Sequence, residues 1–456
     1  MRRNRRKSGS PFPRALDWLL DWLLDWLAAF LTKRVICATL QTMRVLHLVH
    51  QYLPEHVGGV ELYTQSTAAA LTRRGHAVAI CYRQDRPGAG WEVRQEGAVQ
   101  NYALWDGART PAQRFAASFG APRLLASIAA TLDHFRPDLV HVQHLMGLPL
   151  AVRRLLATRR LPYLLTLHDY WWVCVNANLR TNYDQSNCAG PQQHVNCTRC
   201  VLARGGARGT WPLAPALWGG LVWRGRQARR WLTGARMLLA PSAYVRAWYL
   251  GQGAPADRLH VLHLGVTAAA TQPPRAPAGR PAGVRFLYLG SIAPIKGVHV
   301  AVEALRGVTG PAELWLAGDP TVDPAYTAQL QQLADGRVRF LGRLARSDVW
   351  ATLAQCDVLV APSLVPETFC MASYEASASG VPVLAARIGA LAESVTDGQT
   401  GQLLPPGDVA QWRAAFQRLA DDPAQVSAWR ANLRQPLTVD EHVDELIAYY
   451  EKALQL

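Results

Sequence analysis

Lysine is scarce in this chain of 456 residues, although basic residues are not. Arginine supplies all but four of the 48 basic residues, and three of those lysines lie near the ends of the chain, at Lys7, Lys33 and Lys452. The fourth, Lys296, stands alone in the interior of the sequence. Because lysine offers a compact, flexible ammonium where arginine offers a planar fork, Lys296 is a candidate functional cation. The alternative is chance in an arginine-rich composition.

The sequence also lacks any run of 18 or more apolar residues that is free of charge, so no membrane-spanning helix is predicted. Half of the residues are hydrophobic and 18% are charged, which is typical of a globular protein with a substantial core. The length indicates two or three domains.

Acidic residues are missing from one long stretch. Residues 185–256 contain nine arginines and no Asp or Glu, whereas residues 257–456 carry a net charge of −4. The formal net charge of the whole chain is +15. This distribution is compatible with binding to nucleic acid, to an anionic membrane surface or to an anionic substrate.

Residues 1–42 differ from the rest of the chain. A basic arm, RRNRRK, is followed by three LDWL repeats between Leu16 and Leu27. On a helix, a Trp/Leu face behind a basic arm could lie in a membrane interface. The alternative is an extension outside the fold, which would then start at Met43. A secretory signal is not predicted, because Asp residues interrupt the apolar region.

Strands and helices alternate from Met43 onward. Short apolar segments such as 44–49, 77–82 and 163–167 are each followed by a helical pattern, which predicts parallel strands with right-handed crossovers. Ligands of such sheets bind at the carboxyl ends of the strands.

The pattern predicts an α/β chain with two Rossmann-like, doubly wound domains. The segment 271–283, TQPPRAPAGRPAG, is rich in Pro and Gly and indicates a linker. It divides an N-terminal domain, 43–270, from a second domain, 284–435, and we expect a cleft between them. A C-terminal helix is expected within 436–456.

The strongest motif is PETFCMASYEASASGVPVLA, which contains Glu367 and Glu375 eight positions apart. A strand leads into a loop that carries Glu367, and a helix then starts near Cys370 and Met371. Backbone N–H groups at that helix start can cradle an anion. Glu375 could accept hydrogen bonds from vicinal hydroxyls of a ribose or a sugar. The alternative is two ordinary acids at a helix start.

Lys296 belongs to the motif GSIAPIKG, which follows a strand that ends in Gly290. At this position its ammonium could neutralise a diphosphate leaving group in the same cleft. The loop lacks the glycine spacing of a Walker motif, so an ATPase is not predicted.

In their order and spacing, these motifs resemble family 4 of the retaining glycosyltransferases. The resemblance covers nearly the whole chain from Met43 and includes VGGVELYTQSTAAALTRRGHAV, TLHDYW at 166–171 and SASGVPVLAARIGALAESVTDGQTGQLLPPGD. It implies the two-domain GT-B fold and transfer of a sugar from a nucleoside-diphosphate donor. A GT-B nucleotide-sugar epimerase is an alternative within the same fold.

The resemblance implies a role for each motif. Lys296 would bind the donor diphosphate, and Glu375 would hold the ribose hydroxyls. Glu367 would hold and stabilise the donor sugar rather than act as a nucleophile, and His168 would sit near that sugar as a positioning or charge-stabilising group. The remaining donor contacts would come from small residues and backbone amides: Gly58, Gly59, Phe369, Cys370, Met371 and Ala372.

The sequence departs from the family pattern at several positions. Ser291 stands where many members have an arginine that faces the diphosphate, Cys370 replaces a glycine, and HLGVT at 263–267 replaces PNGVD. No D-x-D motif occurs, so a metal-bridged diphosphate is not indicated and we expect metal-independent catalysis without a cofactor.

Four of the eight cysteines fall within 174–200, with the spacing C-x13-C-x8-C-x2-C. This stretch resembles an insertion after the HDYW motif in a subset of bacterial family members. It is a candidate structural zinc site; the alternatives are reduced thiols or disulfides. The four thiols are Cys174, Cys188, Cys197 and Cys200.

The acid-free stretch interleaves arginine with tryptophan between Trp218 and Trp231. Such a helix could lie on a lipid headgroup layer, or its tryptophans could pack inward behind a solvated basic face. The same side chains could stack on single-stranded nucleic acid, but no nucleic-acid-binding signature accompanies them.

Together these observations favour a glycosyltransferase that acts on an anionic, lipid-linked acceptor in cell-surface polysaccharide assembly. Its expected place is the cytoplasm, at the inner face of the cell membrane, with a nucleotide sugar and no nucleic acid as partners. A non-catalytic basic module that binds membrane or nucleic acid is the alternative from another class, but it would have no use for Lys296, Glu367 and Glu375.

Overall fold

The computed structural model describes residues 42–204, 208–267 and 283–456, and residues 44–456 form one compact unit. The predicted extension 1–42 and linker 271–283 lie outside the described residues, apart from Thr42 and Gly283.

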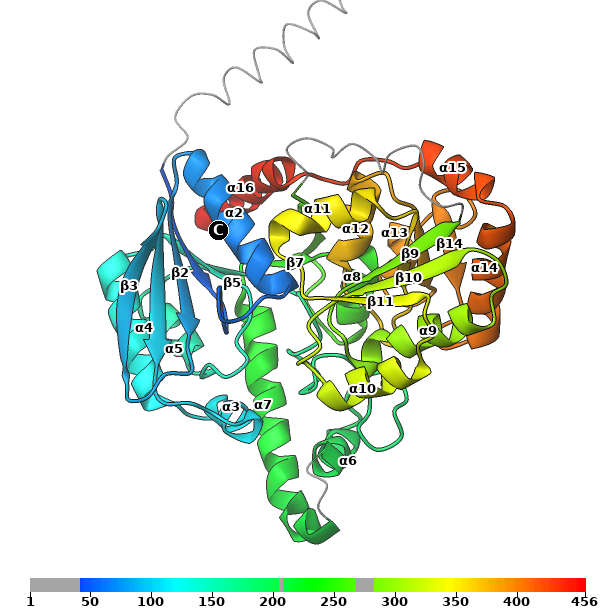
Figure 1. Ribbon diagram of the computed structural model, residues 1–456. Helices are drawn as coiled ribbons and strands as arrows, with labels where there is room; N and C mark the ends of the chain where they lie inside the picture. Colours follow the sequence, from blue (N-terminus) through cyan, green and yellow to red (C-terminus); the bar gives the residue numbers. More distant parts are fainter. Residues whose placement is uncertain (1–41, 205–207, 268–282) are drawn as a thin grey trace, which may run out of the picture. The chain divides into compact units, whose positions relative to one another are not determined.

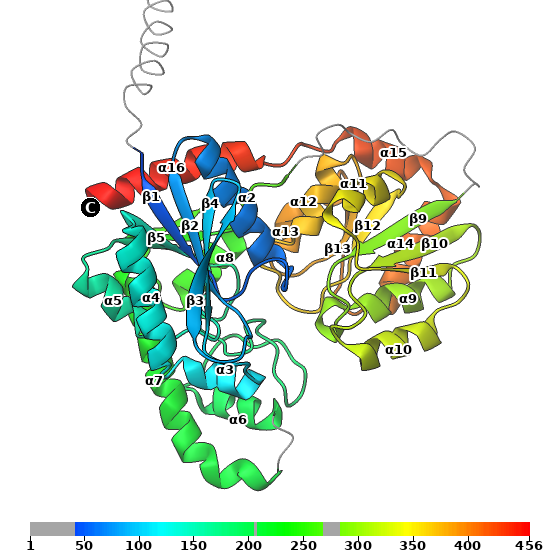
Figure 2. The same cartoon turned by 60° about the vertical axis from the view of Figure 1, so that its left-hand side comes forward.

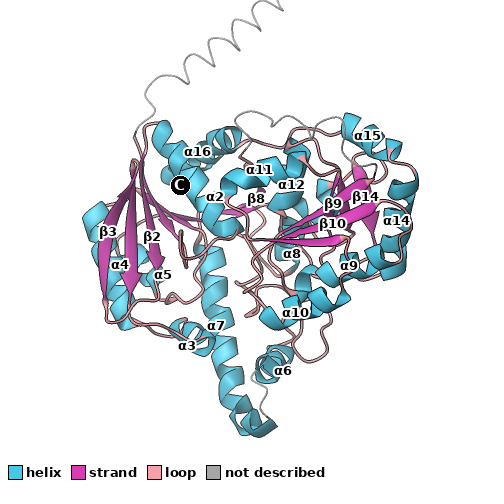
Figure 3. Ribbon diagram, viewed as in Figure 1, coloured by secondary structure: helices cyan, strands magenta, loops and turns pink. Residues whose placement is uncertain are grey.

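The first sheet has eight strands in the order β3-β4-β2-β1-β5-β6-β7-β8 (Figures 1 and 3). Its strands are β1 (Arg44–Leu48), β2 (Ala77–Arg83), β3 (Gly90–Glu96), β4 (Val99–Trp105), β5 (Leu139–Val142), β6 (Tyr163–Thr166), β7 (Met237–Ala240) and β8 (Leu259–Val261). Every residue of β5, β6 and β7 is buried, as expected for parallel strands that are covered on both faces.

Helices cover both faces of this sheet, with α2 and α16 on one face and α4, α5 and α7 on the other (Figure 2). They are α2 (Gly59–Arg73), α3 (Pro111–Ala117), α4 (Pro122–Phe135), α5 (Val152–Thr158), α6 (Val195–Arg204), α7 (Ala214–Gly234) and α8 (Ala243–Gly251). A 3-10 turn, Arg208–Leu213, precedes α7.

One strand departs from the expected parallel pairing. β3 pairs antiparallel with β4, with Glu96 opposite Val99 across a two-residue turn at Gly97. So short a connection can only join antiparallel strands.

The second sheet has six parallel strands in the order β11-β10-β9-β12-β13-β14. These are β9 (Val284–Leu289), β10 (Ala312–Ala317), β11 (Val338–Gly342), β12 (Val358–Ala361), β13 (Val383–Ala386) and β14 (Gly401–Leu404). Its helices are α9 (Val298–Arg306), α10 (Pro324–Leu333), α11 (Arg346–Ala354), α12 (Met371–Ala378), α13 (Leu391–Ser394), α14 (Val409–Asp421) and α15 (Ala424–Ala431). Two doubly wound sheets confirm the predicted fold class.

The last helix, α16 (Val439–Gln455), packs on the first domain, against α2 and β6. Two buried hydrogen bonds fasten it: His442 Nε2 lies 2.9 Å from the Tyr63 hydroxyl, and the Tyr450 hydroxyl lies 2.7 Å from His141 Nδ1. The chain therefore crosses between the domains twice.

Candidate active site

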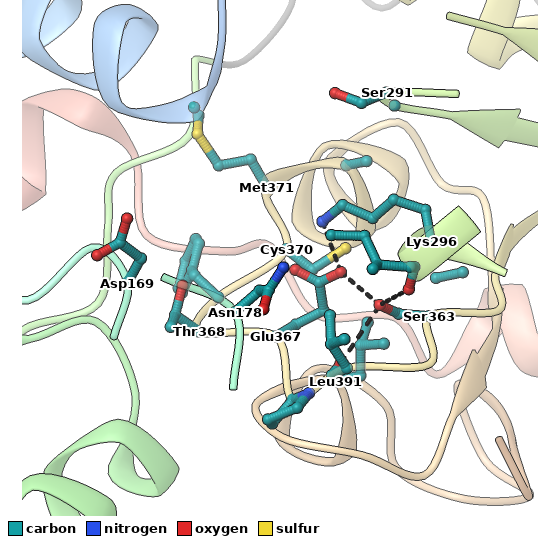
Figure 4. Close-up of a pocket in the computed structure, with 18 of the residues that line it drawn as sticks. Asp169, Asn178, Ser291, Lys296, Ser363, Glu367, Thr368, Cys370, Met371 and Leu391 are labelled. Atoms are coloured by element: carbon teal, nitrogen blue, oxygen red, sulfur yellow. Dashed lines mark hydrogen bonds and ion pairs between the residues drawn. The ribbon is translucent and has the colours of Figure 1, made fainter. Parts of the chain in front are cut away.

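A pocket of about 390 Å³ lies at the carboxyl ends of strands from both sheets (Figure 4). The first domain lines it with the start of α2 and the segment after β6. The second domain lines it with the segments after β9 and β12 and the start of α12. Its lining includes Gly59, His168, Asp169, Asn178, Lys296, Ser363, Glu367, Thr368, Phe369, Cys370, Met371 and Ala372.

Lys296 and Glu367 form an ion pair in this pocket, with 2.7 Å between Nζ and Oε1. The same oxygen accepts a hydrogen bond from the Ser363 hydroxyl, also at 2.7 Å. Burial acts to lower the pKa of Lys296, but the charge of Glu367 and the hydrogen bond to it, with the smaller effect of Cys370, together raise that pKa. The ammonium therefore remains charged at neutral pH.

A short 3-10 turn, Pro294–Lys296, presents the lysine, and Gly297 follows it with φ of +67°. A Cβ at this position would run into the carbonyl oxygen of Pro362. Glycine therefore allows the lysine turn to pack against the loop after β12, which leads to Glu367.

Cys370 is the N-cap of α12 and adopts a left-handed conformation, with φ of +66°. This geometry explains the glycine that the family commonly has there. Burial raises the pKa of the Cys370 thiol to about 12, so the thiol is neutral. The first N–H groups of a helix have no intrahelical acceptor, and at α12 they belong to Met371 and Ala372, which line the pocket.

Glu375 is not brought into this pocket. Its side chain is buried behind the first turns of α12, and its Oε1 lies 2.6 Å from Nη2 of Arg346, at the start of α11. Sequence reasoning missed Arg346, because nothing in its local pattern indicates a partner 29 residues away.

His168 lies at the first-domain side of the pocket. Burial lowers its pKa to about 3, so the imidazole is neutral. Its Nε2 donates to Gln143 Oε1 at 2.7 Å, and the Gln143 amide in turn donates to His47 Nδ1 at 2.9 Å. A neutral ring held in one orientation fits a positioning role rather than a charge-stabilising one. The His168 carbonyl accepts a hydrogen bond from the Thr368 hydroxyl at 2.6 Å, which joins the two domains beside the ligand space.

Of the two predicted glycines, only Gly59 lines the pocket. A Cβ at Gly59 would lie 3.6 Å from the sulfur of Met371, so the first loop does come close to α12. Gly58 lies behind it, where a Cβ would come 2.7 Å from a carboxylate oxygen of Glu61.

Asp169 and Asn178, like Ser363 and Thr368, are polar side chains of the pocket that were not predicted as site residues. Asp169 follows His168, and its Oδ2 lies 3.0 Å from Nε2 of His144. Burial acts to raise the pKa of Asp169, but the interaction with His144 outweighs it and lowers that pKa. Asn178 comes from the cysteine-containing stretch.

Comparisons with known proteins agree with this architecture. Residues 57–269 match the family described as Glycosyltransferase Family 4, and residues 283–422 match the family described as Glycosyl transferases group 1. One match thus falls on each of the two domains of the chain. Among curated proteins, "Glycogen synthase" of Mycobacterium tuberculosis is 36% identical over 176 residues, which are 38% of this chain and 41% of that protein.

A second curated protein, "D-inositol 3-phosphate glycosyltransferase" of Mycobacterium bovis, is 32% identical over 219 residues, or 44% of this chain and 45% of that protein. The chain thus spans less than half the length of the curated relatives that it matches. Among solved structures, Anabaena HepE in complex with UDP and glucose has a TM-score of 0.63 at 20% identity, covering 90% of this chain and 99% of HepE. Sucrose-phosphate synthase from Thermosynechococcus elongatus has a TM-score of 0.63 at 20% identity, covering 91% and 97%. At these identities the solved structures establish the fold.

The four cysteines of the candidate zinc site are all described. The four thiols do lie near one another, since burial and then the charges of the other three raise the pKa of Cys197 to about 12. Within the described ranges, however, no group of three or more His, Cys, Asp or Glu is arranged to hold a metal ion. Asparagine amides donate to two of the sulfurs, Asn176 to Cys200 at 3.3 Å and Asn196 to Cys188 at 3.5 Å. The cysteines described, which do not include Cys37, are all free thiols.

Helix α7 has both buried and exposed members of the predicted Arg/Trp pattern. Arg224 is buried, lies over the Trp171 ring and donates to the Trp171 carbonyl at 2.7 Å, and Trp231 is fully buried. Trp218 and Trp223 remain exposed. No helix in the described part of the chain has the length and apolar character to cross a bilayer.

Proposed function

We propose that this chain is a retaining glycosyltransferase, which moves a sugar from a nucleoside-diphosphate sugar to an anionic, lipid-linked acceptor in cell-surface polysaccharide assembly. The observation that carries the proposal is the Lys296–Glu367 pair beside the first turn of α12, in the same pocket as His168. A cation, helix amides and a carboxylate are thereby gathered around one space that both domains line.

The diphosphate of the donor would bind between Lys296 and the amides of Met371 and Ala372. Negative charge builds up on this diphosphate as its bond to the anomeric carbon breaks. A fixed ammonium and the positive end of a helix dipole stabilise that charge in the transition state. The protein's own groups supply this stabilisation, in keeping with the lack of a D-x-D motif.

The anomeric configuration of the sugar is retained if the acceptor attacks the anomeric carbon from the same face that the diphosphate leaves. The acceptor oxygen then forms a bond to the anomeric carbon while the bond to the phosphate oxygen breaks, and the hydroxyl proton passes to the departing diphosphate. Glu367 Oε1 already holds Lys296 and Ser363, so this carboxylate suits a role as stabiliser of the sugar cation. His168, neutral and fixed through Gln143, would position the sugar.

We propose that the acceptor is anionic and lipid-linked and that the transfer takes place at the cytoplasmic face of the membrane. Residues 185–256 contain no acid, and the region around α7 exposes Trp211, Leu213, Trp218 and Trp223. Aromatic side chains next to arginines suit a headgroup layer.

Cosedimentation with phosphatidylglycerol vesicles, compared with phosphatidylcholine vesicles, tests the proposed membrane binding. Equal retention on both, or unchanged retention of a Trp218→Ala/Trp223→Ala variant, would contradict it.

The donor is tested with purified protein and a panel of uridine, adenosine and guanosine diphosphate sugars. Thermal stabilisation identifies the nucleotide that binds, and release of the nucleoside diphosphate measures turnover. Uridine nucleotides come first, because HepE, a structural neighbour, was solved with UDP and with UDP-glucose. We expect Lys296→Ala and Glu367→Ala to lose turnover; unchanged turnover in both would overturn the site, and an isomerised sugar product would indicate an epimerase.

A further inference from the structure

Asn178 brings a side-chain amide into the donor pocket from the cysteine-containing stretch 174–200. Figure 4 shows it between Asp169 and Glu367, with Lys296 beyond Glu367. The segment follows β6 in the first domain, so an addition to that domain contributes to the surface that would hold the donor.

The backbone around Asn178 is strained and firmly held. Ala177 and Leu179, on either side, have φ of +63° and +55°, a left-handed conformation that costs a residue with a side chain about 1–2 kcal/mol. Leu179 is buried, and its carbonyl accepts a hydrogen bond from the Cys188 amide at 2.6 Å. The Ala177 amide donates to the Cys174 carbonyl at 3.0 Å. The fold thus maintains an unfavourable conformation that holds Asn178 in the pocket.

The hydrogen bonds of Asn178 define what it offers a ligand. Its Oδ1 accepts from the backbone amide of Arg180 at 3.0 Å, which leaves the two N–H groups of Nδ2 without a bond to any described residue. The carboxylates of Asp169 and Glu367 flank it in the pocket. Two carboxylates would repel a phosphate at this point, whereas a neutral sugar hydroxyl can accept a hydrogen bond there.

Arg180 ties this segment to the second domain. Its Nη1 donates to the carbonyl of Leu364 at 3.3 Å, in the loop that leads from β12 to Glu367. Burial lowers the pKa of His299 at the start of α9, and the charge of Arg180 lowers it further, which also places Arg180 beside the second domain. These contacts hold Asn178 and Glu367 at fixed positions relative to each other across the pocket.

We propose that Asn178 donates a hydrogen bond to the sugar moiety of the donor, and that Arg180 is a positioning residue for it. This inference rests on the proposed function. It makes the cysteine-containing stretch part of the donor site, and it separates recognition of the sugar from recognition of the diphosphate.

The test compares the full chain with Asn178→Ala and Asn178→Asp, with UDP-glucose and UDP as probes in titration calorimetry. If the wild type binds adenosine or guanosine nucleotides instead, the matching sugar and diphosphate pair is used. In Asn178→Asp, a carboxylate oxygen still accepts the hydrogen bond from the Arg180 amide, but the N–H groups that would donate to the sugar are removed. We expect Asn178→Ala to bind the nucleotide sugar about tenfold more weakly and the diphosphate within twofold of the wild type. In Asn178→Asp the added negative charge should weaken binding of both probes, and of the nucleotide sugar more than of the diphosphate.

Asn196→Ala is the matched control, since Asn196 belongs to the same stretch but not to the pocket lining; we expect wild-type affinity for both probes. Equal losses for sugar and diphosphate, or wild-type affinity in Asn178→Asp, would overturn the proposal. A wild-type protein that binds none of the nucleotide sugars contradicts the proposed function itself.

A double-mutant cycle tests Arg180. If it acts through Asn178, Arg180→Ala weakens binding of the nucleotide sugar in the wild type and adds no further loss in the Asn178→Ala background. Additive losses would show that Arg180 only stabilises the segment.

Discussion

Nη2 of Arg346 lies 2.6 Å from Oε1 of Glu375, a carboxylate of α12 that is almost completely buried. The pair joins the start of α11 to the middle of α12 in the second domain. A buried carboxylate is costly without a partner, and Arg346 supplies that partner from a side chain that is itself partly exposed.

Removal of the arginine is therefore expected to destabilise the second domain. Arg346→Ala should lower the free energy of unfolding by about 1–3 kcal/mol, because it leaves the Glu375 carboxylate buried and alone. Urea denaturation measures this. Arg343→Ala, at an exposed arginine three residues earlier, is the matched control, and an equal effect in the two variants would argue against the pair.

Lys296 is expected to matter for turnover far more than for stability. Lys296→Ala removes the ammonium that would offset the developing charge on the diphosphate, so we expect kcat to fall about 10²–10³-fold. Lys296→Arg keeps a positive charge with a different shape and should lose less. Steady-state kinetics with the donor identified by the nucleotide panel checks this, and turnover within twofold of wild type in Lys296→Ala would contradict it.

Buried neutral histidines make the fold sensitive to acid. Burial lowers the pKa of His47 to about 3, against 6.5 in an unfolded chain. Between these values the unfolded chain binds a proton that the folded chain does not, so the free energy of unfolding falls as the pH drops below about 6.5. One such group contributes about 1.4 kcal/mol per pH unit.

His47→Leu should therefore flatten the pH dependence of stability. Urea denaturation at several pH values between 4 and 6 should give a slope that is shallower than wild type by about 1.4 kcal/mol per pH unit, since one titrating group is gone. Parallel slopes in the two proteins would show that His47 is not held neutral in the fold.

The hydroxyl of Tyr450 is expected to stabilise the first domain from the end of α16. Tyr450→Phe leaves Nδ1 of the fully buried His141 without its partner, which should cost about 1–2 kcal/mol in unfolding free energy. Tyr449→Phe, at the neighbouring and more exposed tyrosine, serves as the control. Similar losses in the two variants would rule out a specific role for the His141 bond.

The sequence predicted the two doubly wound sheets because buried parallel strands and their connecting helices leave a strong local pattern. Lys296 and Glu367 could be placed together for the same reason: each follows a strand of one sheet, and parallel strands end at a common edge. Their ion pair is a direct result of that topology.

Other features depended on contacts between segments that are distant in sequence. Glu375 was expected in the pocket because its spacing from Glu367 is local, but its pairing with Arg346 is not. Nothing in the sequence indicated that Asn178 lines the pocket, since an asparagine in a stretch without periodicity can face any direction. The zinc prediction rests on cysteine spacing, which gives no information on the asparagine amides that donate to two of the sulfurs.

The return of α16 to the first domain has a consequence for biosynthesis. A ribosome makes the first domain long before it makes residues 439–455, yet Tyr63 and His141 obtain their hydrogen-bond partners from that helix. Until α16 emerges, the nascent first domain carries an uncovered sheet face with buried polar groups unpaired, and domains otherwise tend to fold in order of synthesis. Folding of the first half is thereby coupled to complete translation of the second, so a chain that stops early would leave this face of the first domain open to chaperones and proteases.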